Sequence, residues 1–193
     1  MLHSTEKYDS YSQTSSSQGF DNPQLGYYRL QAGQTQTVST SGSGTKAIGK
    51  MARLTYTFND KYALTGTFRR DGYSAFSANK KYGNFPSVGV NWNIHKESFM
   101  KNLSFLDALA IRGSYGTNGN QSIKPYSTLS KISNNYYLYQ GDANYTMTEY
   151  ISTLGNDNLG WESRTGVNLG LDFSVLKDRI SGSVDVYSTR TND

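Results

Sequence analysis

Residues 51–70 read MARLTYTFNDKYALTGTFRR, and this stretch decides the fold. Before the Asn59-Asp60 pair, apolar residues occupy every second position, with Thr or Arg between them. The same alternation resumes at Tyr62 and continues to Arg69. A period of two places the two sets of side chains on opposite faces of a strand, and an Asn-Asp pair between two such runs is typical of a β-hairpin. We therefore expect two antiparallel strands joined by a two-residue turn.

The pattern recurs twice along the chain. Alternating runs at 88–94 and 109–116 flank a link that could hold a helical turn, and runs at 165–173 and 180–187 flank Lys177-Asp178. Long polar stretches at 70–82 and 118–160 separate these hairpins. Short turns that alternate with long loops, around strands of about ten residues, are typical of transmembrane β-barrels. The sequence therefore predicts six strands in an all-β, antiparallel up-and-down meander.

The alternation also predicts which side chains face lipid. The lipid-facing set is Leu54, Tyr56, Phe58, Leu64, Phe68, Val88, Val90, Leu169 and Leu171. The lumen-facing set is Thr55, Thr65, Asn91, Arg112, Asn168 and Asp185. Trp92, Tyr115 and Trp161 fit the aromatic girdles at the two membrane interfaces.

Composition agrees with strands that have one polar face. The 193 residues are 35% hydrophobic with a mean hydropathy of −0.65, and they include 16 Tyr and 19 Gly. No run approaches the ~20 apolar residues of a membrane helix. The first residues lack the apolar core of a signal peptide, so an outer-membrane assignment implies that the chain is part of a longer protein.

Several other functions have no support in the sequence. The net charge of +4 is scattered, whereas nucleic-acid binding favours a basic stripe. Residues 44–51 resemble a phosphate loop, but Met51 replaces its Ser or Thr and no helix pattern follows. The absence of Cys excludes disulfides and thiolate metal sites. We expect no nucleic-acid partner.

Catalytic and metal-binding chemistry is equally unsupported. His3 and His95 are the only histidines, and neither has a spaced partner for zinc. Residues 156–160 lack the alternating ligands and late Glu of a calcium loop. The acids considered for glycoside chemistry, Asp142, Glu149, Asp157 and Glu162, have no spacing that fixes a pair. We expect no enzyme activity, no metal and no cofactor.

The residue sequences of several strand and loop segments resemble those of a known family. The matching segments are KYALT (61–65), FRRDGYSAF (68–76), KYGNFPSVG (81–89), IRGSYGTNGNQ (111–121), NLGLDF (168–173) and RISGSVDVY (179–187). In this order they resemble the SusC/RagA family of TonB-dependent outer-membrane transporters of Bacteroidota. The resemblance runs from about Lys50 to the end of the chain. One departure is Ala75, where the family pattern leads us to expect a basic residue.

The resemblance implies a barrel of about 22 strands with a plugged lumen, the size class of such transporters. On this basis residues 1–193 are a partial barrel domain. Residues 50–193 would supply about six strands, and residues 1–49 would be mostly extracellular loop, with weak alternation at 26–36 allowing one more strand. The plug domain and the C-terminal strands would lie outside this chain.

The resemblance also implies a function and its partners. Members import glycans or peptides across the outer membrane, draw energy from the TonB complex through the plug, and work with a SusD-like surface lipoprotein. The contacts around this chain would then be membrane lipid, that lipoprotein and the substrate.

The long polar stretch holds the candidate contact residues. These are Tyr136, Tyr137, Tyr139 and Tyr145, which lie where aromatic side chains have no core to fill. They could stack on sugar rings, pack on the lipoprotein or fold the loop onto itself. The alternative to a transporter is a soluble all-β carbohydrate-binding module, in which the apolar faces of two sheets meet in a core. Such a module usually carries charge on its other face, whereas here that face is Ser, Thr, Asn and Gly with few charges.

Overall fold

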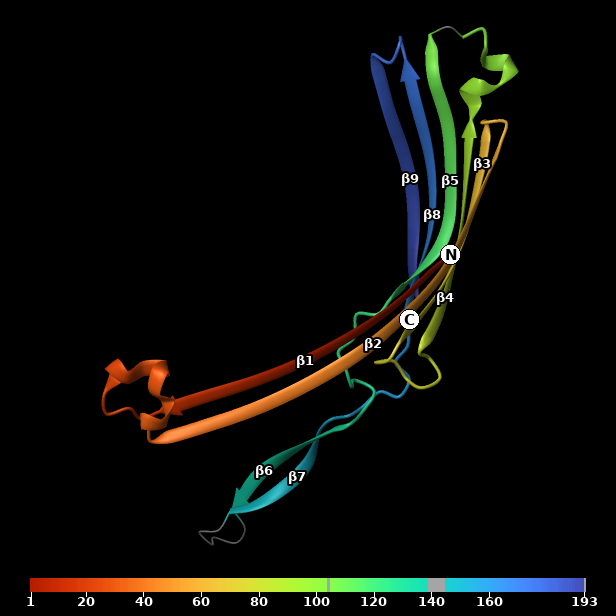
Figure 1. Ribbon diagram of the computed structural model, residues 1–193. Helices are drawn as coiled ribbons and strands as arrows, with labels where there is room; N and C mark the ends of the chain where they lie inside the picture. The colour runs from red at the N-terminus through yellow and green to blue at the C-terminus, as the bar shows by residue number, and fades with distance from the viewer. Residues whose placement is uncertain (104, 139–144, 193) are drawn as a thin grey trace.

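The computed structural model describes residues 1–103, 105–138 and 145–192 as a curved antiparallel sheet with a separate hairpin (Figure 1). The strands are β1 (Leu2–Gln18), β2 (Thr35–Phe58), β3 (Tyr62–Tyr73), β4 (Tyr82–Asn93), β5 (Leu106–Asn120), β6 (Lys131–Leu138), β7 (Tyr145–Thr153), β8 (Glu162–Val175) and β9 (Ile180–Asn192). Within the described residues, the main sheet has the order β1-β2-β3-β4-β5-β8-β9, and β6 pairs with β7. Short 3₁₀ helices are η1 (Pro23–Ala32), η2 (Ile94–Lys96) and η3 (Ser98–Met100).

The six predicted strands are all present, as parts of β2, β3, β4, β5, β8 and β9. Asn59 and Asp60 both have positive φ, at 49° and 53°, and the amide of Lys61 donates to the carbonyl of Phe58 at 3.0 Å. Two left-handed residues are what a type I′ hairpin turn needs. The link between β4 and β5, where residues 97–106 could hold a helical turn, contains the 3₁₀ turn η3, and η2 precedes it. The predicted antiparallel meander is therefore confirmed.

The connections divide between the two ends of the sheet. The β2–β3, β4–β5 and β8–β9 links lie together at one end, which we call the turn end (Figure 1). The other end, the loop end, has the η1 loop, residues 74–81 and the long β5–β8 connection that contains β6 and β7. This division matches the short and long links predicted from the sequence.

Two segments of the loop end differ in secondary structure from what the sequence pattern indicated. Residues 26–32 belong to η1, whose start is capped by the Asn22 side chain accepting from the Gln24 amide, so the possible strand at 26–36 does not form and β2 begins at Thr35. Residues 1–49 are also not mostly loop, since β1 and the first half of β2 pair from Leu2 to Gln18. These strands are rich in Ser, Thr and Gln on both faces. Neither face packs on a core, so no apolar alternation marks them.

The sheet encloses almost no core. Among the described residues, the buried apolar side chains are Ala75, Phe76, Phe85 and Ile94, whereas large apolar side chains are exposed along β2, β3, β4, β8 and β9. A soluble sandwich would cover that surface with a second sheet. No helix among the described residues is long and apolar enough to cross a membrane.

Candidate functional site

The pairing register gives the main sheet one apolar face. Cα partners in neighbouring strands share a face, and the partners Tyr56, Leu64, Val90, Gly113, Leu169 and Val186 form one continuous row across six strands. Adjacent rows hold Leu54, Phe58, Val88 and Leu171 in the same way. Leu54 is 76% exposed and Leu169 is 59% exposed. All nine residues predicted to face lipid therefore lie on one face, which we call the apolar face.

The opposite face is polar and concave. The Thr55 and Thr65 hydroxyls are 3.2 Å apart, and the Arg53 side chain donates to the Thr67 hydroxyl at 3.2 Å. A hollow of about 520 Å³ lies against this polar face, lined by residues that include Arg53, Thr67, Ser87, Asn168 and Arg164. In a barrel wall the concave face is the one that lines the lumen. The predicted lumen-facing residues share this face, as their register shows.

An ion cluster crosses three strands of the polar face. The Arg112 guanidinium on β5 contacts Asp172 on β8 at 2.7 and 3.2 Å and Asp185 on β9 at 3.0 Å. Gly170 lies opposite both Arg112 and Asp185, and a Cβ there would meet Asp185 Oδ1 at 2.7 Å and Arg112 Cζ at 2.9 Å. The missing side chain leaves room for the guanidinium. The single guanidinium contacts both carboxylates, and the cluster of one arginine and two aspartates carries a net charge of −1.

A second cluster surrounds Glu97 at the turn end. Its carboxylate accepts hydrogen bonds from the Tyr62 hydroxyl at 2.6 Å, the Lys61 ammonium at 2.9 Å and the Trp92 indole at 3.2 Å. These three donors lower the pKa of Glu97 from 4.5 to about 2, with the Tyr62 hydroxyl the largest cause. The rings of Tyr62 and Trp92 stack with centroids 6.2 Å apart. The cluster therefore joins the β2–β3 turn, β4 and the β4–β5 link.

Aromatic packing holds the loop end together. Phe76, 2% exposed, lies 5.0 Å from the Trp161 ring centroid, and Phe85 lies 5.3 Å from it on another side. The Trp161 indole donates to the Lys81 carbonyl at 3.1 Å. Trp161 was predicted to lie in a membrane-interface girdle, but it packs on Phe85, which lies opposite Arg69 on the polar face, and so it does not belong to the apolar face. Ala75, at the position where the family pattern suggested a basic residue, is buried beside Phe76.

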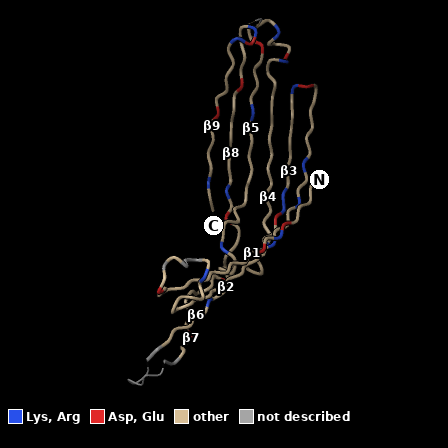
Figure 2. Tube along the Cα trace, turned by 60° about the vertical axis from the view of Figure 1, so that its left-hand side comes forward, with Lys and Arg blue, Asp and Glu red and all other residues tan. Residues whose placement is uncertain are grey.

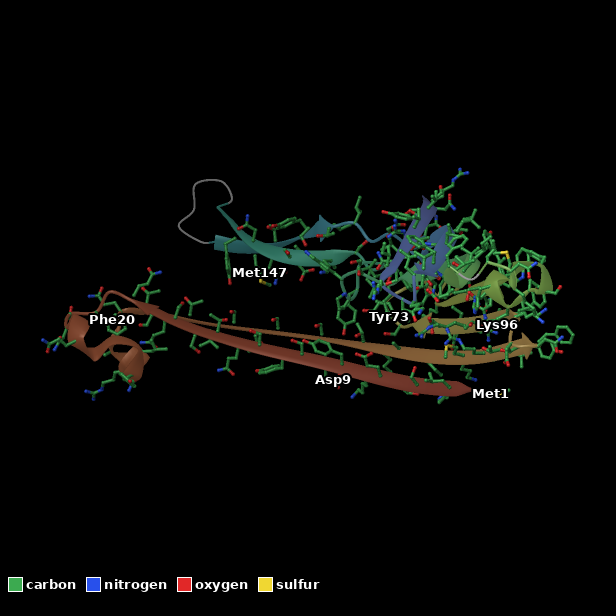
Figure 3. The ribbon with its side chains drawn as sticks, turned by 90° about the horizontal axis from the view of Figure 1, so that it is seen from above. Met1, Asp9, Phe20, Tyr73, Lys96 and Met147 are labelled. Carbon is green, nitrogen blue, oxygen red and sulfur yellow. The ribbon has the colours of Figure 1, made fainter. Side chains whose placement is uncertain are left out.

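Three of the four candidate tyrosines, Tyr136, Tyr137 and Tyr145, belong to the β6–β7 hairpin. Tyr136 lies opposite Met147, and Ile132 lies opposite Ile151 on the same face. These four side chains are 55–67% exposed. Figure 3 places Met147 on this hairpin, away from the crowded side chains around Tyr73 and Lys96. The backbones of Tyr137 and Tyr145 belong to the hairpin, while their side chains and all of Tyr139 lie outside the described residues.

A model of the family described as "TonB dependent receptor-like, beta-barrel" matches residues 2–193. The chain belongs to this TonB-dependent receptor family. The match covers both the six predicted strands and the N-terminal hairpin that the sequence pattern did not mark.

Individual relatives agree with the SusC/RagA resemblance. The chain is 37% identical over 171 residues to TonB-dependent receptor P3 of Formosa agariphila, covering 88% of the chain and 17% of that receptor. It is 37% identical over 150 residues to TonB-dependent receptor SusC of Bacteroides thetaiotaomicron, covering 76% of the chain and 15% of SusC. The chain therefore spans about a sixth of the length of these receptors.

Solved structures of TonB-dependent transporters share the fold. The RagAB peptide transporter superposes with a TM-score of 0.83 and 27% identity, covering 98% of this chain and 21% of that one. The RagAB peptide importer in its open-open state gives a TM-score of 0.80. These matches confirm that the sheet is a segment of a TonB-dependent receptor barrel.

The matched relatives are receptors and transporters, not enzymes. Within the described ranges, no group of three or more His, Cys, Asp or Glu side chains could hold a metal ion. The surfaces that this barrel segment presents are its polar face, its apolar face and its loop-end hairpins.

Proposed function

We propose that the chain forms part of the wall of an outer-membrane TonB-dependent importer that takes up glycans with a SusD-like lipoprotein. The separation of the sheet into an apolar and a polar face carries this proposal. The apolar face suits contact with lipid, because large aliphatic and aromatic side chains cover it from β2 to β9. The polar face offers hydroxyl and amide groups to material in the lumen.

The polar face suits a neutral, hydroxyl-rich substrate. Thr, Ser and Asn side chains line most of the hollow together with Arg53 and Arg164, and the carboxylates of Asp172 and Asp185 both contact the Arg112 guanidinium. Hydrogen bonds to neutral groups can hold a glycan weakly enough to let it pass. Peptides are the second candidate, because the RagAB structure that resembles this chain is that of a peptide transporter.

The loop end would face the cell exterior. In outer-membrane barrels short turns lie on the periplasmic side and long loops lie outside. This orientation places the β6–β7 hairpin where a substrate or a lid lipoprotein arrives. Energy would come from the TonB complex, acting through the plug region of the whole transporter.

The β6–β7 hairpin supplies the contact surface in this proposal. Its exposed apolar side consists of one tyrosine, one methionine and two isoleucines. A tyrosine provides a large contact area at low entropic cost, and the apolar neighbours add to that area. Tyr136 is the candidate with a described, exposed side chain. Tyr137, Tyr139 and Tyr145 remain proposals from the sequence.

The test is to shorten the hairpin in the full-length transporter by replacing residues 131–153 with a short Gly-Ser linker. Three quantities are measured: uptake of labelled oligosaccharide and labelled peptide, co-purification of the lipoprotein, and the fraction of folded barrel in outer membranes. We expect uptake or lipoprotein binding to fall while the folded fraction stays unchanged. Unchanged uptake and unchanged lipoprotein binding would contradict the assigned role of the hairpin.

The substrate class is decided by the same uptake assay on the unaltered transporter. Saturable, TonB-dependent uptake of oligosaccharide supports the glycan proposal. Uptake of peptide alone would contradict it and favour the second candidate.

A further inference from the structure

The apolar face ends in a row of basic side chains toward the loop end. On β3 the outward positions run Tyr62, Leu64, Gly66, Phe68 and then Arg70. Arg70 lies opposite Lys50 on β2, and Lys50 lies opposite His3 on β1. Lys46 is two outward positions farther along β2. We call Lys46, Lys50 and Arg70 the basic patch.

Independent contacts place the basic patch on the apolar face. A Cβ on Gly72 would meet the Tyr82 ring at 2.6 Å and Ile48 Cγ2 at 2.9 Å, so these three residues share one face. The Arg70 guanidinium lies 5.2 Å from the centroid of that same Tyr82 ring. Lys46, Lys50 and Arg70 alternate in step with Ile48 and Gly72 and therefore point the same way.

The neighbouring charges belong to the other face. Arg69 pairs with Asp71 at 2.5 Å, and a Cβ on Gly49 would meet Asp71 Oδ1 at 3.0 Å and Ser4 Oγ at 2.7 Å. This group borders the hollow that contains Phe85 and Trp161. β4 has no charged residue, and the charges of β3 are gathered toward its loop end (Figure 2). Arg69 and Arg70 are consecutive residues of β3, and their side chains therefore point to opposite faces of the sheet.

The distance between the turn end and the basic patch matches the thickness of the apolar band of a barrel. Arg70 lies eight residue steps after Tyr62, and at about 3.4 Å per step the two are roughly 27 Å apart along the strand. A strand tilt of about 40° reduces this to roughly 20 Å, close to the ~25 Å apolar band of outer-membrane barrels. Tyr62 and Trp92 mark one boundary of the band. Lys50 and Arg70 then mark the other, on the loop-end side.

The basic patch carries uncompensated charge. Lys7 on the same face pairs with Asp9 at 2.6 Å. Within the described residues, the Lys46, Lys50 and Arg70 side chains form no ion pair with a carboxylate, and all three residues are exposed. The Tyr82 ring holds the Arg70 guanidinium in place, because a cation is attracted to an aromatic face. Such a site is prepared for an anion.

We propose that the basic patch binds the phosphate of a lipid headgroup in the leaflet at the loop end. Charge complementarity and continuity with the apolar face support this ligand. Acyl chains would lie along Leu54, Phe68 and Val88, and the attached phosphate would then sit beside Lys50 and Arg70. The inference is independent of which nutrient passes through the lumen.

The test compares two lipids on the full-length transporter by native mass spectrometry in detergent. The probes are phosphatidylglycerol, which is anionic, and phosphatidylcholine with the same acyl chains, which is zwitterionic. We expect preferential retention of phosphatidylglycerol. Each basic residue near a membrane surface contributes about fivefold to the binding of anionic lipid, so K50Q/R70Q should weaken the retention of phosphatidylglycerol at least about tenfold.

Matched variants make the result specific. R53Q/R164Q removes the same amount of charge from the polar face and should leave the retention of phosphatidylglycerol unchanged. K50R/R70K keeps the charge of the basic patch and should retain phosphatidylglycerol at the parent level. Equal retention of the two lipids, or an equal loss in both Gln variants, would overturn the proposal. Displacement of the lipid by millimolar inorganic phosphate would also overturn it, because the site would then bind a free anion.

Discussion

The Tyr62 hydroxyl donates a 2.6 Å hydrogen bond to the carboxylate of Glu97, across 35 residues of sequence. Lys61 and Trp92 donate to the same carboxylate, and the Glu97 side chain is 12% exposed. One acid thereby fixes the geometry of the turn end, where two hairpins of the barrel segment meet.

The Glu97 cluster makes the stability of the fold depend on pH in the acid range. Because the folded-state pKa of Glu97 is about 2, below its ordinary value of 4.5, its contribution is complete above pH 4.5 and is lost as the pH falls toward 2. We expect Glu97→Gln to lower the unfolding temperature of the full-length transporter at pH 7 and to flatten its decline between pH 4.5 and 2. Thermal unfolding in detergent measures both. A variant with the same pH profile as the parent would contradict this role.

Gly83 is needed for close packing at the loop end. A Cβ there would meet Phe85 Cζ at 2.5 Å and Trp161 Cδ1 at 3.1 Å, and Phe85 is only 6% exposed. We expect Gly83→Ala to cost about 1–3 kcal/mol in unfolding free energy, the usual penalty for overpacking. The matched control is Gly66→Ala on the neighbouring strand, since no atom lies within 4 Å of its added Cβ. Equal stabilities of the two variants in denaturant unfolding would contradict the packing argument.

The two faces of the β6–β7 hairpin should differ in partner binding. Tyr136→Ala with Met147→Ala removes paired side chains from the apolar side of the hairpin. We expect lipoprotein or substrate binding to weaken about tenfold or more, the size of a binding hot spot. Asn135→Ala with Thr148→Ala changes the opposite face and should have little effect. Titration of the full-length transporter distinguishes the pairs, and equal effects would argue against a directed surface.

The isolated chain should not behave as a soluble monomer. β1 and β9 are the outer strands of the main sheet, and the exposed apolar face includes Val184 at 57% and Val186 at 69% exposure. Unpaired strand edges and large apolar patches both promote association. Size-exclusion chromatography in detergent-free buffer should show aggregates or no soluble protein. A monodisperse monomer that unfolds cooperatively would contradict the barrel-segment account.

The sequence predicts strands well where one face is apolar. Leu54, Leu64 and Leu169 each mark a strand because their neighbours are polar, and lipid imposes that contrast. β1 and the first half of β2 lack the contrast, since both of their faces are polar and only backbone pairing holds them together. β6 and β7 do have an apolar side, but Asn134 on β6 and Glu149 on β7 interrupt its alternation, so the sequence pattern did not mark these strands within the polar stretch at 118–160.

The sequence pattern did not predict the contacts between segments that are distant in the chain. Glu97 lies in a link with no periodicity, and its partners Lys61 and Trp92 reach it only through the register of β3 and β4. Arg112, Asp172 and Asp185 each alternate onto the polar face, but only the stagger of β5, β8 and β9 brings them together. The prediction for Trp161 differed from the structure for another reason. An aromatic residue near a strand end can lie in a girdle at the membrane interface or pack within a loop, and the sequence pattern does not distinguish the two.

The most direct test of the account compares Leu169→Arg with Asn168→Arg in the full-length transporter. These neighbours lie on opposite faces: Leu169 opposes Val186 on the apolar face, and Asn168 lines the hollow on the polar face. A charge at mid-bilayer on the lipid face costs about 2–4 kcal/mol, whereas the lumen accepts one. The fraction of folded transporter in outer membranes should fall strongly for Leu169→Arg and stay near the parent level for Asn168→Arg. Equal folded fractions for the two variants would contradict the assignment of the apolar face to lipid.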